Sequence, residues 1–300
     1  MHSNEPEIVA IDRAYGSQSM VESLRRVAVR PPDETFANAD PSSWHYSSAP
    51  DLDEARAEHA VLVEILRNHG AEVIKHERPA DGQADAIFVH DPLLVTDHGT
   101  VVLRMGKELR RGEEEPLAAT LEDAGVPILG RLTGNATAEG GDLVWLDHDT
   151  LAVGQGFRTN ADGLAQLESV LSPIGVTCVA VPLPFYDGAA ACLHLMSIIS
   201  MLADDLAVVY EPLLPVPFWR LLRHRGIEIV PVPHEEFATQ APNVLALAPR
   251  RCVMLEDNVK TQARLEAAGC EVLTYRGREL SLKAEGGATC LTRPVLRSAP

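Results

Sequence analysis

The residue best suited to covalent chemistry is Cys290, in the segment KAEGGATCLTRP at positions 283–294. Two glycines, Gly286 and Gly287, let the backbone turn tightly and approach a ligand closely. We therefore expect Cys290 to be presented at a turn, just before a short apolar strand. A thiol in that position is a candidate nucleophile, because its thiolate attacks electrophilic carbon. The alternative is a buried structural cysteine, since free cysteines are among the most buried residues.

Four other residues occupy comparable places in a repeating pattern that ends at Cys290. The five are separated by 48, 55, 49 and 47 positions: Asp91, Glu139, His194, Asn243 and Cys290. If the repeats surround one axis, these positions converge on it and bring two carboxylates, an imidazole and a thiol into one pocket. Carboxylates hold a cation, and an imidazole moves protons beside a thiolate. The alternative is a set of ordinary turns, which are rich in Asp and Gly.

The elements that position these residues are units of one helix and three strands, with a period of about fifty residues. Apolar residues at helical spacing predict helices over 51–70, 113–124, 161–171, 217–225 and 260–268. Short apolar runs predict strands that include 26–30, 71–76, 86–92, 100–103, 143–146, 189–199 and 271–275. Five such units indicate a closed circular array.

Composition predicts an ordinary globular protein with a sizeable core, because 46% of the 300 residues are hydrophobic. The formal net charge of −17 disfavours nucleic acid and anionic membrane surfaces as partners and favours a small cationic ligand. No apolar run approaches the roughly eighteen residues of a membrane span. We expect residues 1–24 to form a polar tail and residues 25–300 to form a single catalytic domain.

The five cysteines are scattered, odd in number and without a C-x-x-C pair. Because the N-terminus also lacks the basic and apolar regions of a secretory signal, we expect the protein in a reducing cytoplasm. Four cysteines are expected to be structural: Cys178, Cys192, Cys252 and Cys270. The chain has no phosphate-binding loop and no zinc-spaced Cys/His set, so we expect neither a cofactor nor a metal. A homodimer is left open.

Six short motifs resemble those of the guanidine-modifying superfamily. They are FVHD (88–91), RRGE (110–113), EGGD (139–142), GFRTN (156–160), LHL (193–195) and GGATC (286–290). Each is weak alone, but six in order between about residues 26 and 296 are specific. The superfamily includes arginine deiminases, amidinotransferases and dimethylarginine dimethylaminohydrolases. The resemblance implies a five-bladed α/β propeller, the pentein fold, in agreement with the repeat.

Two positions favour the dimethylarginine hydrolase branch. Deiminases and amidinotransferases resemble each other in having an acid two residues after the His, where this chain has Met196. Deiminases usually have Asn where this chain has Asp85, as the dimethylarginine hydrolases do. A methylated guanidinium has fewer N–H donors and more apolar surface. It therefore needs fewer carboxylates and tolerates an apolar, polarisable side chain in the pocket wall. The residue type at position 90 favours the deiminases instead. The dimethylarginine hydrolases often have an acid there, and the His90-Asp-Pro of this chain is closer to the deiminase Arg-Asp-Pro.

The expected reaction is hydrolysis of a dimethyl- or monomethylarginine to citrulline and a methylamine. Asp91 and Glu139 would accept N–H bonds from the guanidinium and hold it in line with the Cys290 thiolate. His194 would protonate the departing amine and then deprotonate a water. By resemblance, four residues bind the amino-acid end of the substrate: Arg110 and Arg158 its carboxylate, and Asp85, with the backbone at Ala284 as a weaker candidate, its ammonium.

Other interpretations remain at this stage. His194 lies in the almost wholly apolar run 189–199, where a histidine is more often a core residue. The runner-up enzyme is an arginine deiminase or amidinotransferase with an altered carboxylate clamp. From a different class, a non-catalytic propeller such as a ribosome anti-association factor would need no Cys/His/Glu set and would use a basic surface, so both features count against it here.

Overall fold

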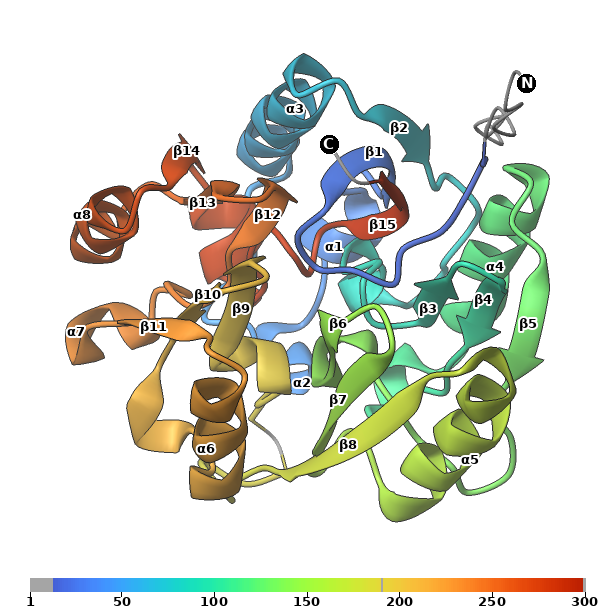
Figure 1. The fold of residues 1–300 in the computed structure, drawn as a ribbon. Coiled ribbons are helices and arrows are strands. Elements are labelled where there is room, and N and C mark those ends of the chain that lie inside the picture. Colours follow the sequence, from blue (N-terminus) through green and yellow to red (C-terminus); the bar gives the residue numbers. More distant parts are fainter. Residues whose placement is uncertain (1–12, 190, 299–300) are drawn as a thin grey trace, which may run out of the picture.

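Five three-stranded sheets form a ring about a central axis in the computed structural model, which describes residues 13–189 and 191–298 (Figure 1). The expected five-bladed α/β propeller is therefore confirmed. The strands, sheet by sheet in spatial order, are β15 (Arg293–Ser298), β1 (Ser23–Val29) and β2 (Glu72–Lys75); β3 (Leu93–Thr96), β4 (Gly99–Val102) and β5 (Ile128–Arg131); β6 (Leu143–Asp147), β7 (Thr150–Gln155) and β8 (Thr177–Pro182); β9 (Ile199–Ala203), β10 (Leu206–Val209) and β11 (Glu228–Pro231); β12 (Leu245–Ala248), β13 (Arg251–Leu255) and β14 (Glu271–Tyr275).

All five sheets share one topology. The middle strand pairs antiparallel with the strand nearest the axis and parallel with the outer strand; in β1, for example, Val27 faces Pro294 of β15 and Val73 of β2. A parallel pair needs a crossover connection, and helices supply it. The helices are α1 (Glu34–Ala37), α2 (Pro41–Trp44) and α3 (Leu52–Asn68) in the first unit, then α4 (Glu114–Asp123), α5 (Ala161–Leu171), α6 (Val216–His224), α7 (His234–Phe237) and α8 (Val259–Ala267).

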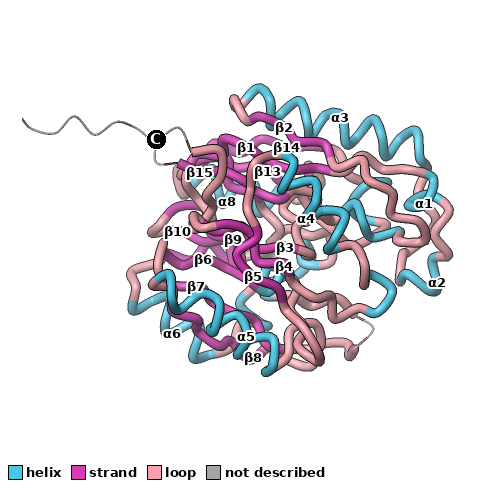
Figure 2. The backbone as a smooth tube through the Cα atoms, turned by 90° about the vertical axis from the view of Figure 1, so that its right-hand side faces the viewer, coloured by secondary structure: helices cyan, strands magenta, loops and turns pink. Residues whose placement is uncertain are grey.

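The helices lie outside the strands. In Figure 2, α3 lies above the sheets and α5 and α6 lie below them. The longest, α3, begins where the side chain of Asp51 accepts a hydrogen bond from the backbone N–H of Glu54, as an N-cap residue does. Its apolar face packs Leu62 and Leu66 into a core cluster shared with β1. None of the helices in the described ranges is long and apolar enough to cross a bilayer.

Two expected strands are wrong. Residues 84–87 form the 3₁₀ helix η1 (Ala84–Ile87), and β3 begins only at Leu93. The run 189–199 contains η5 (Leu195–Ser197), and β9 begins at Ile199. A third 3₁₀ helix, η3 (Gly140–Asp142), precedes β6 in the same way. The segments 86–92 and 194–196 are buried although they turn at the axis of the ring, because burial does not require an extended backbone.

Part of the segment expected as a tail belongs to the fold. Gly16 forms a bridge to Leu296 of β15, and Gln18 donates a hydrogen bond to the carbonyl of His148. Val21 is buried, and β1 already begins at Ser23. Packing of the chain against the propeller therefore starts well before residue 25. Residues 1–12 lie outside the described residues.

A buried carboxylate fixes the segment that leads to Cys290. Glu58 of α3 accepts hydrogen bonds from the backbone N–H groups of three consecutive residues, each at 2.9 Å: Arg278, Glu279 and Leu280. These N–H groups start a π-helical turn (Arg278–Leu282), and the orphan donors at a helix start are stabilised by an anion. Residues of the first unit thus position the end of the last one.

Buried histidines predict a loss of stability in mild acid. Burial lowers the pKa of His59 to about 4, and Lys75 adds to this; burial and Arg30 lower the pKa of His76 to about 4. Unfolded histidines titrate near about 6.5, so the unfolded chain binds more protons between these values. The free energy of unfolding should therefore be at its full value above about pH 6.5 and fall as the pH drops towards 4.

This loss is measurable by urea unfolding at several pH values between 4.5 and 7.5. In His59→Leu, which removes one titrating ring, the slope of unfolding free energy against pH should shrink by up to about 1.4 kcal/mol per pH unit. Equal slopes for the variant and the wild type would show that His59 is not held neutral by the fold.

Candidate active site

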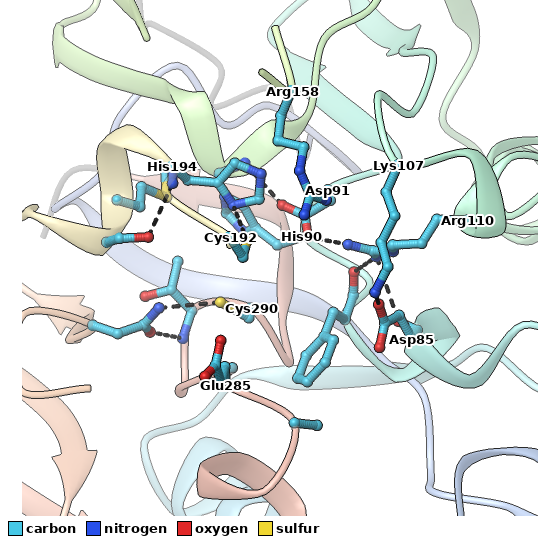
Figure 3. A pocket seen from close by; sticks show the side chains of 18 of the residues that line it. Asp85, His90, Asp91, Lys107, Arg110, Arg158, Cys192, His194, Glu285 and Cys290 are labelled. Carbon is cyan, nitrogen blue, oxygen red and sulfur yellow. Dashed lines mark hydrogen bonds and ion pairs between the residues drawn. The ribbon is translucent and has the colours of Figure 1, made fainter. Parts of the chain in front are cut away.

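One pocket at the axis of the propeller contains the residues singled out from the sequence (Figure 3). Its lining includes Asp85, His90, Asp91, Arg110, Arg158, His194, Met196, Ala284 and Cys290. Glu139 is 0% exposed and lies behind His194, to which it is hydrogen bonded. All the candidate site residues therefore meet in one place, from segments as far apart as residues 85 and 290.

The five repeat positions lie at the entrances to the strands nearest the axis. Asp91 follows η1, Glu139 and His194 are the N-cap residues of η3 and η5, and Asn243 and Cys290 lie in turns before β12 and β15. Because these strands converge on the axis, four of the five side chains line the same pocket, and that of Glu139 lies directly behind His194.

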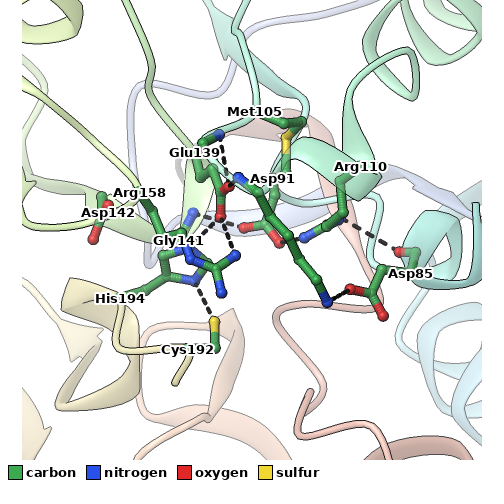
Figure 4. A network of polar contacts seen from close by, with 12 residues as sticks. Asp85, Asp91, Met105, Arg110, Glu139, Gly141, Asp142, Arg158, Cys192 and His194 are labelled. Carbon is green, nitrogen blue, oxygen red and sulfur yellow. Dashed lines mark hydrogen bonds and ion pairs between the residues drawn. The ribbon is translucent and has the colours of Figure 1, made fainter. Parts of the chain in front are cut away.

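His194 and Glu139 form the central hydrogen bond of the site (Figure 4). His194 Nε2 lies 2.7 Å from Oε2 of Glu139, while Oε1 accepts the backbone N–H groups of Gly106 and Lys107 at 2.9 Å each. Burial opposes both charges. The hydrogen bond and charge of His194 nevertheless lower the pKa of Glu139, and Cys192, Asp91 and Glu139 raise the pKa of His194 well above its usual value. His194 is therefore an imidazolium poised to donate a proton.

This geometry corrects the role expected for Glu139. The sequence predicted that Glu139 accepts N–H bonds from a guanidinium, but one of its oxygens is occupied by His194 and the other by two backbone N–H groups. The side chain of Glu139 is fully buried and contacts the ring of His194.

The EGGD motif is explained by close packing. A side chain on Gly141 would collide with the His194 ring, and one on Gly140 with the carbonyl of His90. Asp142 is buried; it accepts hydrogen bonds from the Thr159 hydroxyl at 2.6 Å and from the Leu195 N–H at 2.9 Å. Asp142 thereby ties η5, and with it His194, to the neighbouring sheet.

Asp91 faces the pocket with its charge held by protein donors. Oδ1 accepts the N–H of Gly141 at 2.9 Å, and Oδ2 accepts Nη1 of Arg110 at 2.6 Å. Burial opposes ionisation, but Arg110 and His194 lower the pKa of Asp91, so it is a carboxylate. Such a group is suited to binding a cation in the pocket.

The two arginines expected at a substrate carboxylate differ in how far their N–H groups are occupied. Arg110 donates to Asp91, to both oxygens of Glu113 and to the carbonyl of Phe88 at 3.0 Å. Arg158 lies 3.6 Å from Glu139 and donates no hydrogen bond to any residue that the structure describes. Arg158 thus has more donors to offer a ligand, and contact of either arginine with a substrate stays a prediction.

Cys290 is partly buried near Asp91 and His194. Burial, and after it the charge of Asp91, raises the pKa of the Cys290 thiol to about 12. The free site therefore holds a thiol, and a bound cation is needed to favour the thiolate. Cys290 lies in a turn, as expected from the sequence. The glycine before it permits close packing, because Gly286 lies against the Phe88 ring, while the left-handed residue of the segment is Glu285.

Sequence reasoning missed the pair of residues that holds Asp85. Tyr46 donates its hydroxyl to Oδ1 at 2.8 Å, and Lys107 Nζ lies 2.6 Å from Oδ2. Lys107 also donates to the carbonyl of Trp44 and sits 4.9 Å above the centre of its ring. Asp85 lines the pocket as expected, but it already accepts two hydrogen bonds, and its contact with a substrate ammonium stays a prediction. The sequence pattern gave Lys107 no signal.

Cys192 was expected to be a structural cysteine away from the site, and its structural role stays a prediction, although the residue lies at the pocket. It lines the pocket, and its sulfur lies 3.6 Å from Nδ1 of His194 (Figure 4). Cys178, Cys252 and Cys270 do not line this pocket. The distinction was invisible in the sequence because it depends on how the His194 ring is turned, and not on the spacing of the cysteines.

His90 is neutral in this environment. Burial, and after it Arg293, lowers the pKa of His90 to about 3, and its Nδ1 lies 2.8 Å from the carbonyl of Thr292. The ring therefore connects the FVHD segment to the turn that carries Cys290. At the other side of the pocket, Ala284 lines the wall beside Glu285.

One group of side chains in the described part of the chain has ligand atoms close enough to hold a metal: Asp91, Glu139 and His194, within 4.8 Å of one another. Their oxygen and nitrogen atoms already bond to Arg110, to backbone N–H groups and to each other. The hydrogen-bonded arrangement accounts for the cluster as it stands.

A thiol, an imidazolium and buried carboxylates at the axis of a five-bladed α/β propeller define the class of guanidine-modifying enzymes. The family model described as "N,N dimethylarginine dimethylhydrolase, eukaryotic" matches residues 32–297. The N(G),N(G)-dimethylarginine dimethylaminohydrolase of Streptomyces coelicolor is 33% identical over 232 residues, which cover 77% of this chain and 81% of that protein. The chain belongs to the dimethylarginine dimethylaminohydrolase family, as the six motifs indicated.

Two further comparisons show the shared fold and how far each likeness extends. The structure of the dimethylarginine dimethylaminohydrolase from Pseudomonas aeruginosa, a mutant complexed with citrulline, superposes with a TM-score of 0.77 at 24% identity; the match covers 92% of this chain and all of that one. An arginine deiminase of Mycobacterium marinum is 35% identical over 193 residues, but these cover 54% of this chain and 47% of that protein. The hydrolase likeness therefore extends over more of the chain.

Proposed function

We propose that this protein hydrolyses Nω-methylated arginines, converting dimethylarginine to citrulline and dimethylamine. The observation that carries the proposal is the pocket itself, in which Cys290, His194 and Asp91 meet beside the apolar side chain of Met196. Membership of the dimethylarginine dimethylaminohydrolase family supports the same substrate class. A methylated guanidinium needs a cation-binding carboxylate and an apolar wall, and this pocket has both.

In the first half of the proposed reaction, the guanidinium binds against Asp91, and its positive charge favours loss of the Cys290 thiol proton to solvent, which leaves the thiolate. The sulfur attacks the guanidinium carbon, and an S–C bond forms. His194, held as an imidazolium by Glu139, donates its proton to the methylated nitrogen, and the C–N bond breaks to release dimethylamine.

In the second half, neutral His194 takes a proton from a water whose oxygen attacks the same carbon. The S–C bond then breaks, Cys290 returns as a thiolate and citrulline forms. One further proton from the collapsing intermediate goes to the released amine. The single ring of His194 thus serves as acid and then as base, and Glu139 keeps it oriented for both steps.

For the amino-acid end of the substrate, we propose Arg158 as the main carboxylate ligand because it has the most unoccupied donors. Arg110 instead donates to Asp91 and holds that carboxylate in place. Asp85 and Lys107, which are bonded to each other, line the adjoining part of the pocket. We further propose that the propeller acts as one catalytic domain, since every sheet contributes a side chain to the pocket. A reducing cytoplasm is the proposed location, because all five cysteines are free.

The Met196→Asp variant tests the basis of substrate choice. A carboxylate at this pocket-lining position would accept N–H bonds from unmethylated arginine and would oppose burial of the methyl groups of dimethylarginine. The ratio of kcat/KM for arginine to that for dimethylarginine should rise by about ten- to hundredfold. Steady-state citrulline formation from the two substrates, measured side by side, gives the ratio.

Met196→Leu is the matched control, because it keeps an apolar side chain of similar volume and should leave the ratio nearly unchanged. An equal loss of activity on both substrates in Met196→Asp would mean that position 196 does not face the guanidinium. Preference of the wild type for arginine would favour the deiminase alternative, to which the Mycobacterium marinum match also points.

A further inference from the structure

The Cys290 sulfur lacks the partner that a thiol nucleophile usually has. His194 would be the obvious donor, but Nε2 of its ring faces Glu139 and Nδ1 faces the sulfur of Cys192. Burial and the nearby Asp91 both raise the pKa of Cys290, and the charge of His194 lowers it without a hydrogen bond to the sulfur. A second source of stabilisation is therefore needed within the protein.

The side-chain amide of Asn243 supplies a hydrogen bond to that sulfur. Its Nδ2 lies 3.1 Å from Sγ of Cys290, and no other residue in the described ranges donates to this atom. In Figure 3 a dashed line ends at the sulfur of the labelled Cys290. Hydrogen bonds to ionised groups are stronger than those between neutral groups. The bond from Asn243 therefore becomes stronger when the Cys290 thiol ionises, which favours the thiolate.

The orientation of the amide is fixed by its other end. Oδ1 of Asn243 accepts the backbone N–H of Thr289 at 3.0 Å, so the NH₂ group must face the sulfur. Asn243 is 3% exposed, and a side chain on Gly287 would come within 2.6 Å of its Cγ atom. Gly287 thus leaves the space that lets the amide reach both Thr289 and Cys290.

We propose that Asn243 is a catalytic residue that stabilises the Cys290 thiolate and aims its sulfur into the pocket. The proposal deepens the proposed function and rests on it for the assignment of Cys290 as the nucleophile. It also gives Asn243 the chemical role that the repeat pattern left unassigned: the fourth unit contributes the hydrogen-bond donor for the thiolate.

Asn243→Asp is the sharpest variant, because it has the same shape and keeps the oxygen that accepts from Thr289. It replaces the donor with an acceptor and adds a negative charge beside the sulfur. We expect the rate of Cys290 alkylation by iodoacetamide, followed by mass spectrometry of the peptide that contains Cys290, to fall by about ten- to hundredfold at pH 8. The pH at which alkylation reaches half its maximum should rise, and kcat/KM for dimethylarginine should fall in parallel.

Asn258→Asp is the matched control for burying a carboxylate. Asn258 is also buried, at 0% exposed, and bonds to Thr239 through both ends of its amide, but it does not line the site pocket. In this variant the alkylation of Cys290 should keep its wild-type pH profile. A merely structural effect of a buried charge would instead move both variants.

A second pair of variants serves if Asn243→Asp does not fold. Asn243→Ser keeps a hydroxyl donor and Asn243→Ala has none, so Cys290 should be alkylated faster in the serine variant. Wild-type alkylation profiles in folded Asn243→Asp, or equal profiles in the serine and alanine variants, would overturn the proposal. Alkylation needs no substrate, so a wild-type protein that fails to hydrolyse methylarginine would count against the proposed function alone.

Discussion

Replacement of Cys290 with serine should abolish hydrolysis of dimethylarginine while the fold stays intact. A hydroxyl is a far weaker nucleophile than a thiolate unless a base removes its proton. In the free site His194 is already an imidazolium, bonded to Glu139 and facing Cys192, so it cannot remove a proton from residue 290. We expect kcat/KM to fall by roughly 10³- to 10⁶-fold, measured as citrulline formed per folded molecule.

Cys252→Ser is the matched control for this variant. Cys252 is fully buried in β13 and does not line the pocket, so its substitution should lower the free energy of unfolding without changing the rate per folded molecule. Circular dichroism and urea unfolding verify the fold of both variants. Activity close to wild type in Cys290→Ser would exclude the covalent mechanism.

The second large effect is expected for His194→Gln. The glutamine amide still donates a hydrogen bond to the buried Glu139, so the network is kept while the proton donor is lost. Loss of general acid-base catalysis typically costs about 10²- to 10⁴-fold in rate. We expect a loss of this size in kcat for dimethylarginine. The Cys252→Ser control, assayed in parallel, should keep the wild-type kcat per folded molecule.

A substrate analogue distinguishes the acid role from a merely structural one. If the methylated amine is replaced by a thiol leaving group, departure needs little help from an acid, because a thiol leaves readily as a thiolate. The first half of the reaction should then be slowed much less in His194→Gln than it is with dimethylarginine. Equal losses with both leaving groups would show that His194 is not the proton donor.

Much of the fold could be predicted from local pattern alone. The helix expected over 51–70 is α3 (Leu52–Asn68), because its capping Asp51 and its apolar spacing are properties of adjacent residues. The entrances to β3 and β9 were predicted as strands because their residues form short apolar runs. They are 3₁₀ turns at the axis, and that placement depends on contacts with other sheets.

The site was predictable only where the repeat carried the information. The near-equal spacing of Asp91, Glu139, His194 and Cys290 predicted that they lie close together, since equivalent positions of a circular array surround one axis. Spacing could not show that Glu139 faces His194 and is hidden from the pocket.

Lys107 and Cys192 were missed for a related reason. The side chain of Lys107 reaches Asp85 from a separate turn, and Cys192 meets His194 through the local course of one loop. Both contacts depend on side-chain directions, which have no signature in residue spacing.

The central claim is that this pocket selects and hydrolyses methylated arginines. The most direct measurement is kcat/KM of the wild-type protein for dimethylarginine, monomethylarginine and arginine, with citrulline as the common product. We predict that both methylated substrates are hydrolysed more efficiently than arginine, because the wall at Met196 offers no acceptor for the extra N–H groups of arginine. Preference for arginine, or no citrulline from any of the three, would contradict the account.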